Sequence, residues 1–335
     1  MNLPPPPAAA FLLPCPLAAG WQVIAATRLP RKDRAGAPAG GYSAAVYLPQ
    51  GDELWLLSDA PTGKLAGWRG LRGLPGNRLI PLQSLALQGT APVPLPSAID
   101  GEGLVFLGEQ AWVASEGRRS DERPAQLLRF GRRSGELERA FPLPADWNPA
   151  HGRGLAANQG PESLALLVRP RQPAVLLMAA ESALLQDPPG SVRVLAWSLS
   201  DPAGPPAPLR SLLLPFGDSW GLTDLLVVPR PGEPPGLLGL LRRFETPDRW
   251  QVRLALYPLP AAARPGEPPL APLFSWDLIG TGLPPDNWEA LTIGPDLADG
   301  RASLVLVSDD NFSPLQDNHL ARIAPRQGPG CLASP

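Results

Sequence analysis

The chain has 335 residues, of which 44% are hydrophobic, and it carries a formal net charge of −2 with a pI near 5.8. These values exclude a disordered chain and argue against a nucleic-acid partner, and no apolar run reaches the roughly 18 residues of a membrane-spanning helix. The 47 prolines and 34 glycines lie between short apolar runs, which indicates many short strands joined by turns.

The N-terminal segment 1–20, MNLPPPPAAAFLLPCPLAAG, is rich in proline and contains no basic residue. A secretory signal begins with basic residues, so we expect an N-terminal extension and a cytoplasmic protein. A degenerate export signal, with a periplasmic or secreted protein, is the alternative. Cys15 and Cys331 lie near opposite ends of the chain. We interpret them as unrelated thiols in terminal tails, the second tail covering 326–335, and a disulfide that locks a closed ring is the alternative.

Five segments share a turn residue, then a polar or acidic residue, then an apolar run. They are GYSAAVYLP (41–49), DGEGLVFLG (100–108), GPESLALLV (160–168), GLTDLLVVP (221–229) and NWEALTIGP (287–295). Their alignment superposes Ser43, Glu102, Glu162, Asp224 and Glu289, at steps of 59, 60, 62 and 65 residues. A repeat of this length indicates one structural unit that recurs along the chain.

Further apolar runs follow each of these segments. Second runs cover 53–60, 110–119, 174–182, 236–245 and 303–312; third runs cover 125–130, 191–199, 250–259 and 319–325; fourth runs cover 79–87, 139–144, 210–216 and 271–278. Four short strands per unit are typical of a β-propeller. We therefore predict an all-β domain over 21–325 with five four-stranded blades, six blades being the alternative. The run WQVIAATRLP (21–30) is expected to complete the last blade and close the ring.

The innermost strands of a propeller converge on its axis, so equivalent residues of successive blades face one another. Glu102, Glu162, Asp224 and Glu289 are therefore expected to form a ring of carboxylates. Such a ring repels itself unless protons or a cation neutralise it, and hard oxygen ligands suit Ca²⁺ or Mg²⁺. The alternative is that each acid caps its own strand by accepting backbone amides.

The ends of the second runs add further polar side chains. They are Asp59, Glu116, Glu181, Asp309, Asp310 and Asn311, with Arg242 and Arg243 at the equivalent place in the fourth unit. An arginine among acids can hold a phosphate or carboxylate, or it can pair with its acidic neighbours. His319 lies in a strand pattern and is interpreted as structural. A Ser-His-Asp site through His151 lacks the G-x-S-x-G elbow that would support it.

The motifs DGEGLVFL, GPESLALL and DNWEALTI, and above all LVSDDNFSPLQDNHLARI, resemble the phytase-like family, described as "esterase-like activity of phytase". The resemblance covers about residues 40–325. It implies a propeller that hydrolyses phosphate or carboxylic esters with bound calcium. The sequence departs from the family pattern at Ser43, where an acid is expected, and at LLRRF in the fourth unit.

A calcium-dependent hydrolase would give the candidate residues distinct roles. The metal ligands would be Glu102, Glu162, Asp224, Glu289 and Asp309; Glu289 or Asp310 would act as general base; and Arg242, Arg243 and Asn311 would hold an anionic substrate. The sequence thus predicts a Ca²⁺-dependent ester or phosphoester hydrolase that acts on a small molecule. We expect a monomer without a nucleic-acid partner or a membrane span. The alternative is a non-catalytic propeller that binds a ligand or a protein partner and whose acids are structural.

Overall fold

Strands make up nearly all of the regular structure of this chain. The computed structural model describes residues 12–96, 98–117, 124–201, 204–230, 232–247, 249–259, 269–329 and 331. In these ranges the helices are three single turns of 3-10 helix, η1 (Leu17–Ala19), η2 (Leu71–Gly73) and η3 (Ile279–Thr281). The described part of the chain has no helix with the length and apolar character that crossing a membrane requires.

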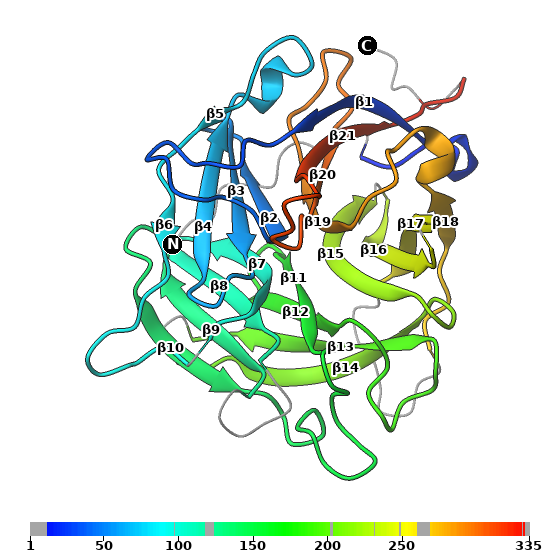
Figure 1. Cartoon of the computed structure of the whole chain (residues 1–335). Coiled ribbons are helices and arrows are strands. Elements are labelled where there is room, and N and C mark those ends of the chain that lie inside the picture. The colour runs from blue at the N-terminus through cyan, green and yellow to red at the C-terminus, as the bar shows by residue number, and fades with distance from the viewer. Residues whose placement is uncertain are drawn as a thin grey trace.

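The strands form five antiparallel sheets, or blades, arranged around one axis (Figure 1). Blade 1 contains β2 (Tyr42–Leu48), β3 (Glu53–Ser58) and β4 (Lys64–Arg69), with β5 (Ile80–Pro81) and β6 (Leu85–Ala86) both pairing with β4. Blade 2 contains β7 (Gly101–Leu107), β8 (Gln110–Ser115), β9 (Gln126–Gly131) and β10 (Leu137–Pro142). Blade 3 contains β11 (Pro161–Leu167), β12 (Ala174–Ala180), β13 (Ser191–Leu199) and β14 (Ala207–Pro215).

Blade 4 contains β15 (Gly221–Arg230), β16 (Glu233–Glu245), β17 (Arg249–Pro258) and β18 (Phe274–Asp277). Blade 5 contains β19 (Trp288–Ile293), β20 (Leu304–Ser308), β21 (His319–Pro325) and β1 (Trp21–Arg28). The inner strands β2, β7, β11, β15 and β19 each contact the next one around the axis. The predicted five-bladed propeller is therefore confirmed.

The N-terminal strand closes the ring, as the run 21–30 predicted. β1 pairs with β21 from Trp21↔Pro325 to Arg28↔His319, so the first strand of the chain is the outer strand of the last blade. A disulfide between Cys15 and Cys331 joins the chain ends beside this pair, with their Cα atoms 5.6 Å apart. The interpretation of these cysteines as unrelated thiols was wrong. A closed ring brings both ends of the chain to one blade, and that proximity makes the bond geometrically accessible.

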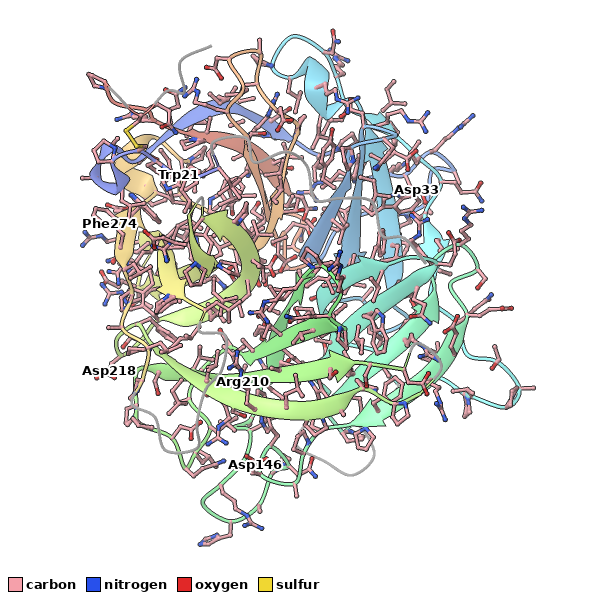
Figure 2. The ribbon with its side chains drawn as sticks, turned by 180° about the vertical axis from the view of Figure 1, so that it is seen from behind. Trp21, Asp33, Asp146, Arg210, Asp218 and Phe274 are labelled. Carbon is pink, nitrogen blue, oxygen red and sulfur yellow. A yellow bond between two sulfur atoms is a disulfide. The ribbon has the colours of Figure 1, made fainter. Side chains whose placement is uncertain are left out.

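The hydrophobic core lies between neighbouring blades. Large aromatic side chains fill these spaces, and the wholly buried tryptophans are Trp21, Trp68, Trp112, Trp147 and Trp288. At the junction of blades 4 and 5, Trp21 meets Trp276 edge to face with their ring centroids 5.7 Å apart. Figure 2 shows Trp21 and Phe274 on this same flank of the molecule. Packing between blades leaves the axis to the polar side chains at the ends of the strands.

Part of the predicted N-terminal extension is described, namely residues 12–20. Leu12 is buried in the core of blades 4 and 5, and the Leu17 carbonyl accepts the indole N–H of Trp276 at 2.7 Å. Residues 1–11 of this prediction lie outside the described part of the chain, as do 330 and 332–335 of the predicted tail. The stretch 12–20 therefore packs on the propeller that it precedes.

Candidate metal centre on the propeller axis

Each inner strand contains a β-bulge near its first residue. In β7, Gly101 pairs with Ser115 and Gly103 pairs with Ala114, which leaves Glu102 without a partner between them. The same interruption occurs in β2, β11, β15 and β19. A bulge adds one residue to one strand and redirects its side chain. The five bulge residues are Ser43, Glu102, Glu162, Thr223 and Glu289.

Asp224, predicted as a metal ligand, lies one residue beyond the bulge of its strand. The bulge residue of β15 is Thr223, whose hydroxyl reaches the Trp288 carbonyl of the next blade at 3.3 Å. The Asp224 carboxylate accepts the backbone amides of Leu225 at 2.8 Å and of Leu291, in β19, at 2.6 Å. Asp224 thus has the capping role that the sequence left as the alternative, and it ties blade 4 to blade 5.

Three of the four predicted ring acids converge. Carboxylate oxygens of Glu102, Glu162 and Glu289 all lie within 4.8 Å of one another, and the three residues are only 6–8% exposed. Glu102 also belongs to a second group of the same compactness, with Asp100 and Glu116. Burial and crowding of like charges make this arrangement unfavourable for ionised carboxylates alone.

A second ring of charged residues surrounds the bulge residues. Its four acids directly follow the second strand of their blades, and Arg242 lies within the second strand of blade 4. The backbone of each member is hydrogen-bonded to, or paired with, the residue two positions before the bulge. The Asp59, Glu116, Glu181 and Asp309 amides donate to the carbonyls of Gly41, Asp100, Gly160 and Asn287, and Arg242 pairs with Gly221. Two rings of five residues, with one residue from each blade, therefore surround the axis of this propeller. The second ring contains four acids and one arginine.

Arg242 is the positive charge in this arrangement. Its Nη2 atom lies 3.0 Å from Glu289 Oε1 and 3.8 Å from Glu181 Oε1. The same Glu289 oxygen accepts the side-chain amide of Asn287 at 2.8 Å. One guanidinium cannot neutralise the surrounding acids, because Glu102, Glu162, Glu181, Glu289 and Asp309 all face this space.

The pKa values of the axial acids are raised. Burial, followed by repulsion from Glu289, raises the pKa of Asp59 to about 7 and that of Asp309 to about 8. Burial and neighbouring carboxylates hold the pKa values of Glu102 and Glu162 well above their usual range. Without a bound cation, several of these groups therefore retain a proton near neutral pH.

The donor set fits a hard divalent cation. All the converging ligand atoms are oxygens, as Ca²⁺ and Mg²⁺ require. Two further buried oxygens at this site, Asp59 Oδ1 and Asn287 Oδ1, accept no hydrogen bond from the described residues. Asn287 is only 3% exposed, and burying an unpaired amide oxygen costs free energy unless a ligand satisfies it. Sequence reasoning missed Asn287, since it precedes its strand and is not itself acidic.

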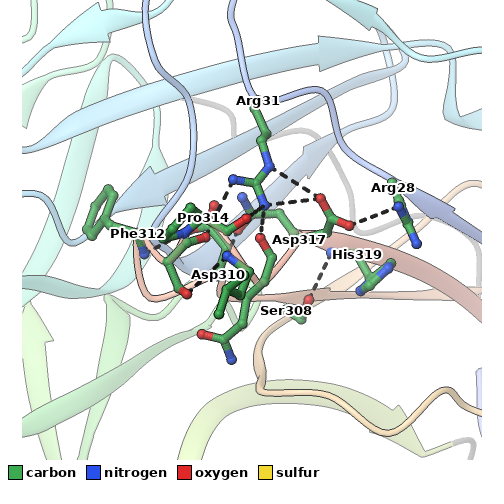
Figure 3. Close-up of polar contacts among 12 residues, drawn as sticks. Arg28, Arg31, Ser308, Asp310, Phe312, Pro314, Asp317 and His319 are labelled. Atoms are coloured by element: carbon green, nitrogen blue, oxygen red, sulfur yellow. Dashed lines mark hydrogen bonds and ion pairs between the residues drawn. The ribbon is translucent and has the colours of Figure 1, made fainter.

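The remaining predicted residues lie at the edge of this centre. Asp310 Oδ1 accepts the backbone amides of Gly41 at 2.9 Å and Phe312 at 3.2 Å (Figure 3). The exposed Asn311 donates its side-chain amide to Gln316. Arg243 points away from Arg242, because successive strand residues face opposite sides. It pairs with Glu245 at 2.7 Å, and its guanidinium lies 5.1 Å from the Trp220 ring.

A Ser-His-Asp group occurs, although not through His151, which is exposed in a turn. His319 Nδ1 contacts Asp286 Oδ2, the Ser308 hydroxyl donates to that same oxygen at 2.8 Å, and the His319 amide donates to Ser308 Oγ. In a nucleophilic triad the serine donates to the imidazole. Here it donates to the acid, so the group joins β20 to β21 and lacks the serine-to-imidazole hydrogen bond of a nucleophilic triad.

Solved structures with a similar arrangement of strands have little sequence in common with this chain. They include RS223-β-xylosidase (11% identity, 92% of this chain and 98% of that chain, TM-score 0.49) and the Cellvibrio cellulosa α-L-arabinanase in complex with arabinohexaose (9%, 85% and 92%, 0.46). Another is the periplasmic gluconolactonase of Pseudomonas aeruginosa (13%, 91% and 96%, 0.40). A search of curated protein sequences found no significant match.

A family profile does match the sequence. The family is phytase-like, described as "esterase-like activity of phytase", and the match covers residues 37–312. That range begins before β2 and ends after β20, so it includes all five bulge residues and the second ring of charges. On this match, the chain belongs to the phytase-like family.

Proposed function

We propose that this protein is an ester or phosphoester hydrolase that depends on a divalent cation, Ca²⁺ being the ion that we favour. The observation that carries the proposal is the convergence of Glu102, Glu162 and Glu289, whose carboxylate oxygens lie within 4.8 Å of one another on the axis. Membership of the phytase-like family supports an ester as the substrate. We expect the substrate to be a small molecule and the protein to act as a monomer.

The axial residues divide into ligands and substrate-binding groups. Glu102, Glu162 and Glu289 would hold the ion, with Asp309 as a further ligand. We leave Asp224 out of this set, because its carboxylate does not belong to the converging group and accepts two backbone amides. A bound cation would polarise the ester oxygen and lower the pKa of a water molecule. Arg242 lies within reach of the same space and would pair with the anionic oxygen of a phosphate or carboxylate.

Proton transfer is assigned to one of two carboxylates. Glu289 is the stronger candidate, because it faces the ligand cluster and is oriented by Arg242 and Asn287. Asp310 is the second candidate, although its Oδ1 atom is occupied by two backbone amides. Arg243 and Asn311 would act only at the periphery, since their side chains have partners away from the axis.

The test combines metal binding with turnover. Calorimetry would measure Ca²⁺ binding to the chelator-treated protein, and 4-nitrophenyl acetate and 4-nitrophenyl phosphate would serve as substrates. We expect Glu102→Gln and Glu162→Gln to weaken Ca²⁺ binding, and Glu289→Gln to reduce turnover by about a hundredfold. Glu233→Gln, at the surface of blade 4, is the matched control and should change neither. Ca²⁺ binding without turnover of either substrate would favour the non-catalytic propeller, and absence of both would end the proposal.

The disulfide bears on the compartment. We propose the periplasmic or secreted alternative, because structural disulfides persist in oxidising compartments and are rare in the cytosol. Thiol counting on protein isolated under thiol-blocking conditions tests this. Two reactive thiols per chain in the native host would support a cytoplasmic location.

A further inference from the structure

A cavity of about 590 Å³ lies beside blade 1, next to the axial centre. Its walls come from the segment after β1, from the β3–β4 turn and from the loop that follows β20. The lining residues that matter for its chemistry are Arg31, Lys32, Lys64, Asp310, Phe312 and Pro314. Neither the axial metal centre nor the family match assigns a role to this cavity.

The lysines of this chain are concentrated in that one cavity. Lys32 and Lys64 are the only lysines in the sequence, although lysine and arginine together number 29. Arginine supplies the positive charge everywhere else. Both lysines nevertheless line the same cavity, from segments 32 residues apart. A lysine ammonium is a compact point charge, which suits an anionic group that approaches end-on.

Neither lysine forms an ion pair with an acid in the described residues, although Lys64 lies close enough to the Asp33 carboxylate for electrostatic attraction. Lys64 Nζ donates to the Pro38 carbonyl, and the nearby Asp33 carboxylate, at the rim of blade 1 in Figure 2, accepts the amides of Ala35 and Ala37. Arg31 is engaged differently, since Asp317 and the carbonyls of the 313–316 loop hold its guanidinium (Figure 3). The two ammonium groups are therefore positive charges of the cavity that have no acid at ion-pairing distance in the described residues, and they remain available to a ligand.

Apolar residues line much of the remaining cavity wall, together with Ser58 and Thr62. Phe312 is 54% exposed, and Pro38, Ala39, Ala60 and Pro314 line the same space. The backbone of Phe312 has a φ of 51°, a left-handed conformation that is unfavourable for an aromatic residue. The Asp310 carboxylate holds it there by accepting the Phe312 amide. An exposed aromatic ring kept in a strained conformation beside two cations points to a ligand with an apolar body and an anionic group.

Gly40 and Gly41 lie between the cavity and the axial centre. A Cβ atom on Gly40 would lie 2.8 Å from Asp310 Oδ2, on the cavity side, and a Cβ atom on Gly41 would lie 2.1 Å from the Phe312 ring and 2.4 Å from Asp59 Oδ1. The missing side chains let both carboxylates approach the backbone closely. The cavity that contains the lysines therefore borders the axial centre at Gly40 and Asp310.

We propose that this cavity binds amphipathic organic anions, with Lys32 and Lys64 holding a carboxylate or phosphoryl group and Phe312 packing on the apolar body. The suggestion that this cavity selects the substrate rests on the proposed hydrolase function. Binding of an anion to the cavity can be measured without turnover.

The experiment uses the unusual lysine content. Reductive methylation of the chelator-treated protein with ¹³C-formaldehyde labels only Lys32, Lys64 and the α-amino group, and the single variants Lys32→Gln and Lys64→Gln assign the signals. Phenylphosphonate and phenylacetate are the two anionic probes, benzamide is the neutral probe, and inorganic phosphate is the probe without an apolar body. We expect at least one of the two aromatic anions to shift both lysine signals saturably, and benzamide to shift neither. Comparison of phenylphosphonate with phenylacetate then shows whether the cavity prefers a phosphoryl group or a carboxylate.

Calorimetry on the unmethylated protein then measures each contribution. Lys32→Gln, Lys64→Gln and Phe312→Ala should each weaken the bound anion by about tenfold, and inorganic phosphate should bind at least about tenfold more weakly than the aromatic anion. The control Arg133→Gln, an exposed cation paired with Glu109, should leave the affinity unchanged. The proposal is overturned if neither aromatic anion moves the lysine signals, if the double lysine variant binds as tightly as the parent, or if inorganic phosphate binds equally well. Because no metal or turnover is involved, these failures leave the hydrolase proposal standing, and an inactive hydrolase leaves the cavity proposal standing.

Discussion

Asp224 in β15 accepts the backbone amide of Leu291 in β19 at 2.6 Å, across the boundary between blades 4 and 5. Its other oxygen accepts the amide of Leu225 at 2.8 Å, and the residue is only 3% exposed. A buried acid with two backbone donors is a structural element, because its removal leaves both amides without their acceptor in the protein interior.

The first prediction follows from these two bonds. Asp224→Ala should lower the free energy of unfolding by about 2 kcal/mol or more, since two buried amides lose their acceptor. Urea unfolding followed by tryptophan fluorescence measures this change. The Ca²⁺ stoichiometry of the folded variant should equal that of the parent protein. A loss of Ca²⁺ binding at unchanged stability would return Asp224 to the ligand set.

The second prediction concerns pH. Asp59 and Asp309 have folded-state pKa values of about 7 and about 8, chiefly through burial, whereas an unfolded aspartate titrates near 4. Between these values the folded protein holds protons that the unfolded chain has released. The metal-free protein must therefore lose stability as the pH rises from about 4 to about 8. We expect its melting temperature to be at least about 5 °C lower at pH 8 than at pH 5.

Calcium should reverse this trend, because a cation replaces the protons and its affinity rises as they leave. Differential scanning fluorimetry from pH 5 to 8.5, with chelator and with CaCl₂, gives both curves. The double variant Glu102→Gln/Glu162→Gln removes two acids whose pKa values are raised and should flatten the metal-free curve. A metal-free protein that is most stable at pH 8 would contradict the prediction that the folded state binds more protons than the unfolded chain.

The inner strands could be predicted from the sequence because their chemistry is unusual. Segments such as PESLALL are apolar on both faces, and only strands enclosed between two blades have that property. The third strand of blade 1, β4 with the sequence KLAGWR, was not predicted. Gly67 interrupts its apolar run, and a Cβ atom there would lie 3.1 Å from the side chains of Leu82 and Trp55, a tight contact.

The axial site was harder to predict than the fold. An alignment of repeats assumes unbroken alternation, but each inner strand has a bulge that shifts its register by one residue. In four blades the shift fell on the aligned residue, whereas in β15 it placed Thr223 on the axis and Asp224 in the wall. The positions of Asn287 and of the lysine cavity depend on loops. A pattern of strands in the sequence does not predict which loops lie close together.

The third prediction concerns Arg242, whose guanidinium lies 3.0 Å from Glu289. Removing this charge relieves repulsion against an incoming cation, so Arg242→Gln should bind Ca²⁺ more tightly, by about tenfold. The same variant should hydrolyse 4-nitrophenyl phosphate more slowly, because the anionic substrate loses its partner. Arg243→Gln is the matched control, since its side chain pairs with Glu245 instead, and both parameters should stay unchanged. Weaker Ca²⁺ binding in Arg242→Gln would place the ion elsewhere.

The last prediction concerns ring closure, which depends on the β1–β21 ladder and on the disulfide beside it. The bond joins residues 316 positions apart, and restricting so long a loop in the unfolded chain is worth up to about 5 kcal/mol in the chain-entropy model. Cys15→Ser/Cys331→Ser should therefore lower the melting temperature, and reduction of the parent protein should reproduce the effect. Hydrogen exchange should rise in β1 and β21 before it rises in β7 or β11, because the closing strand is the one released. Uniform exchange in all five blades would mean that the ladder alone holds the ring shut.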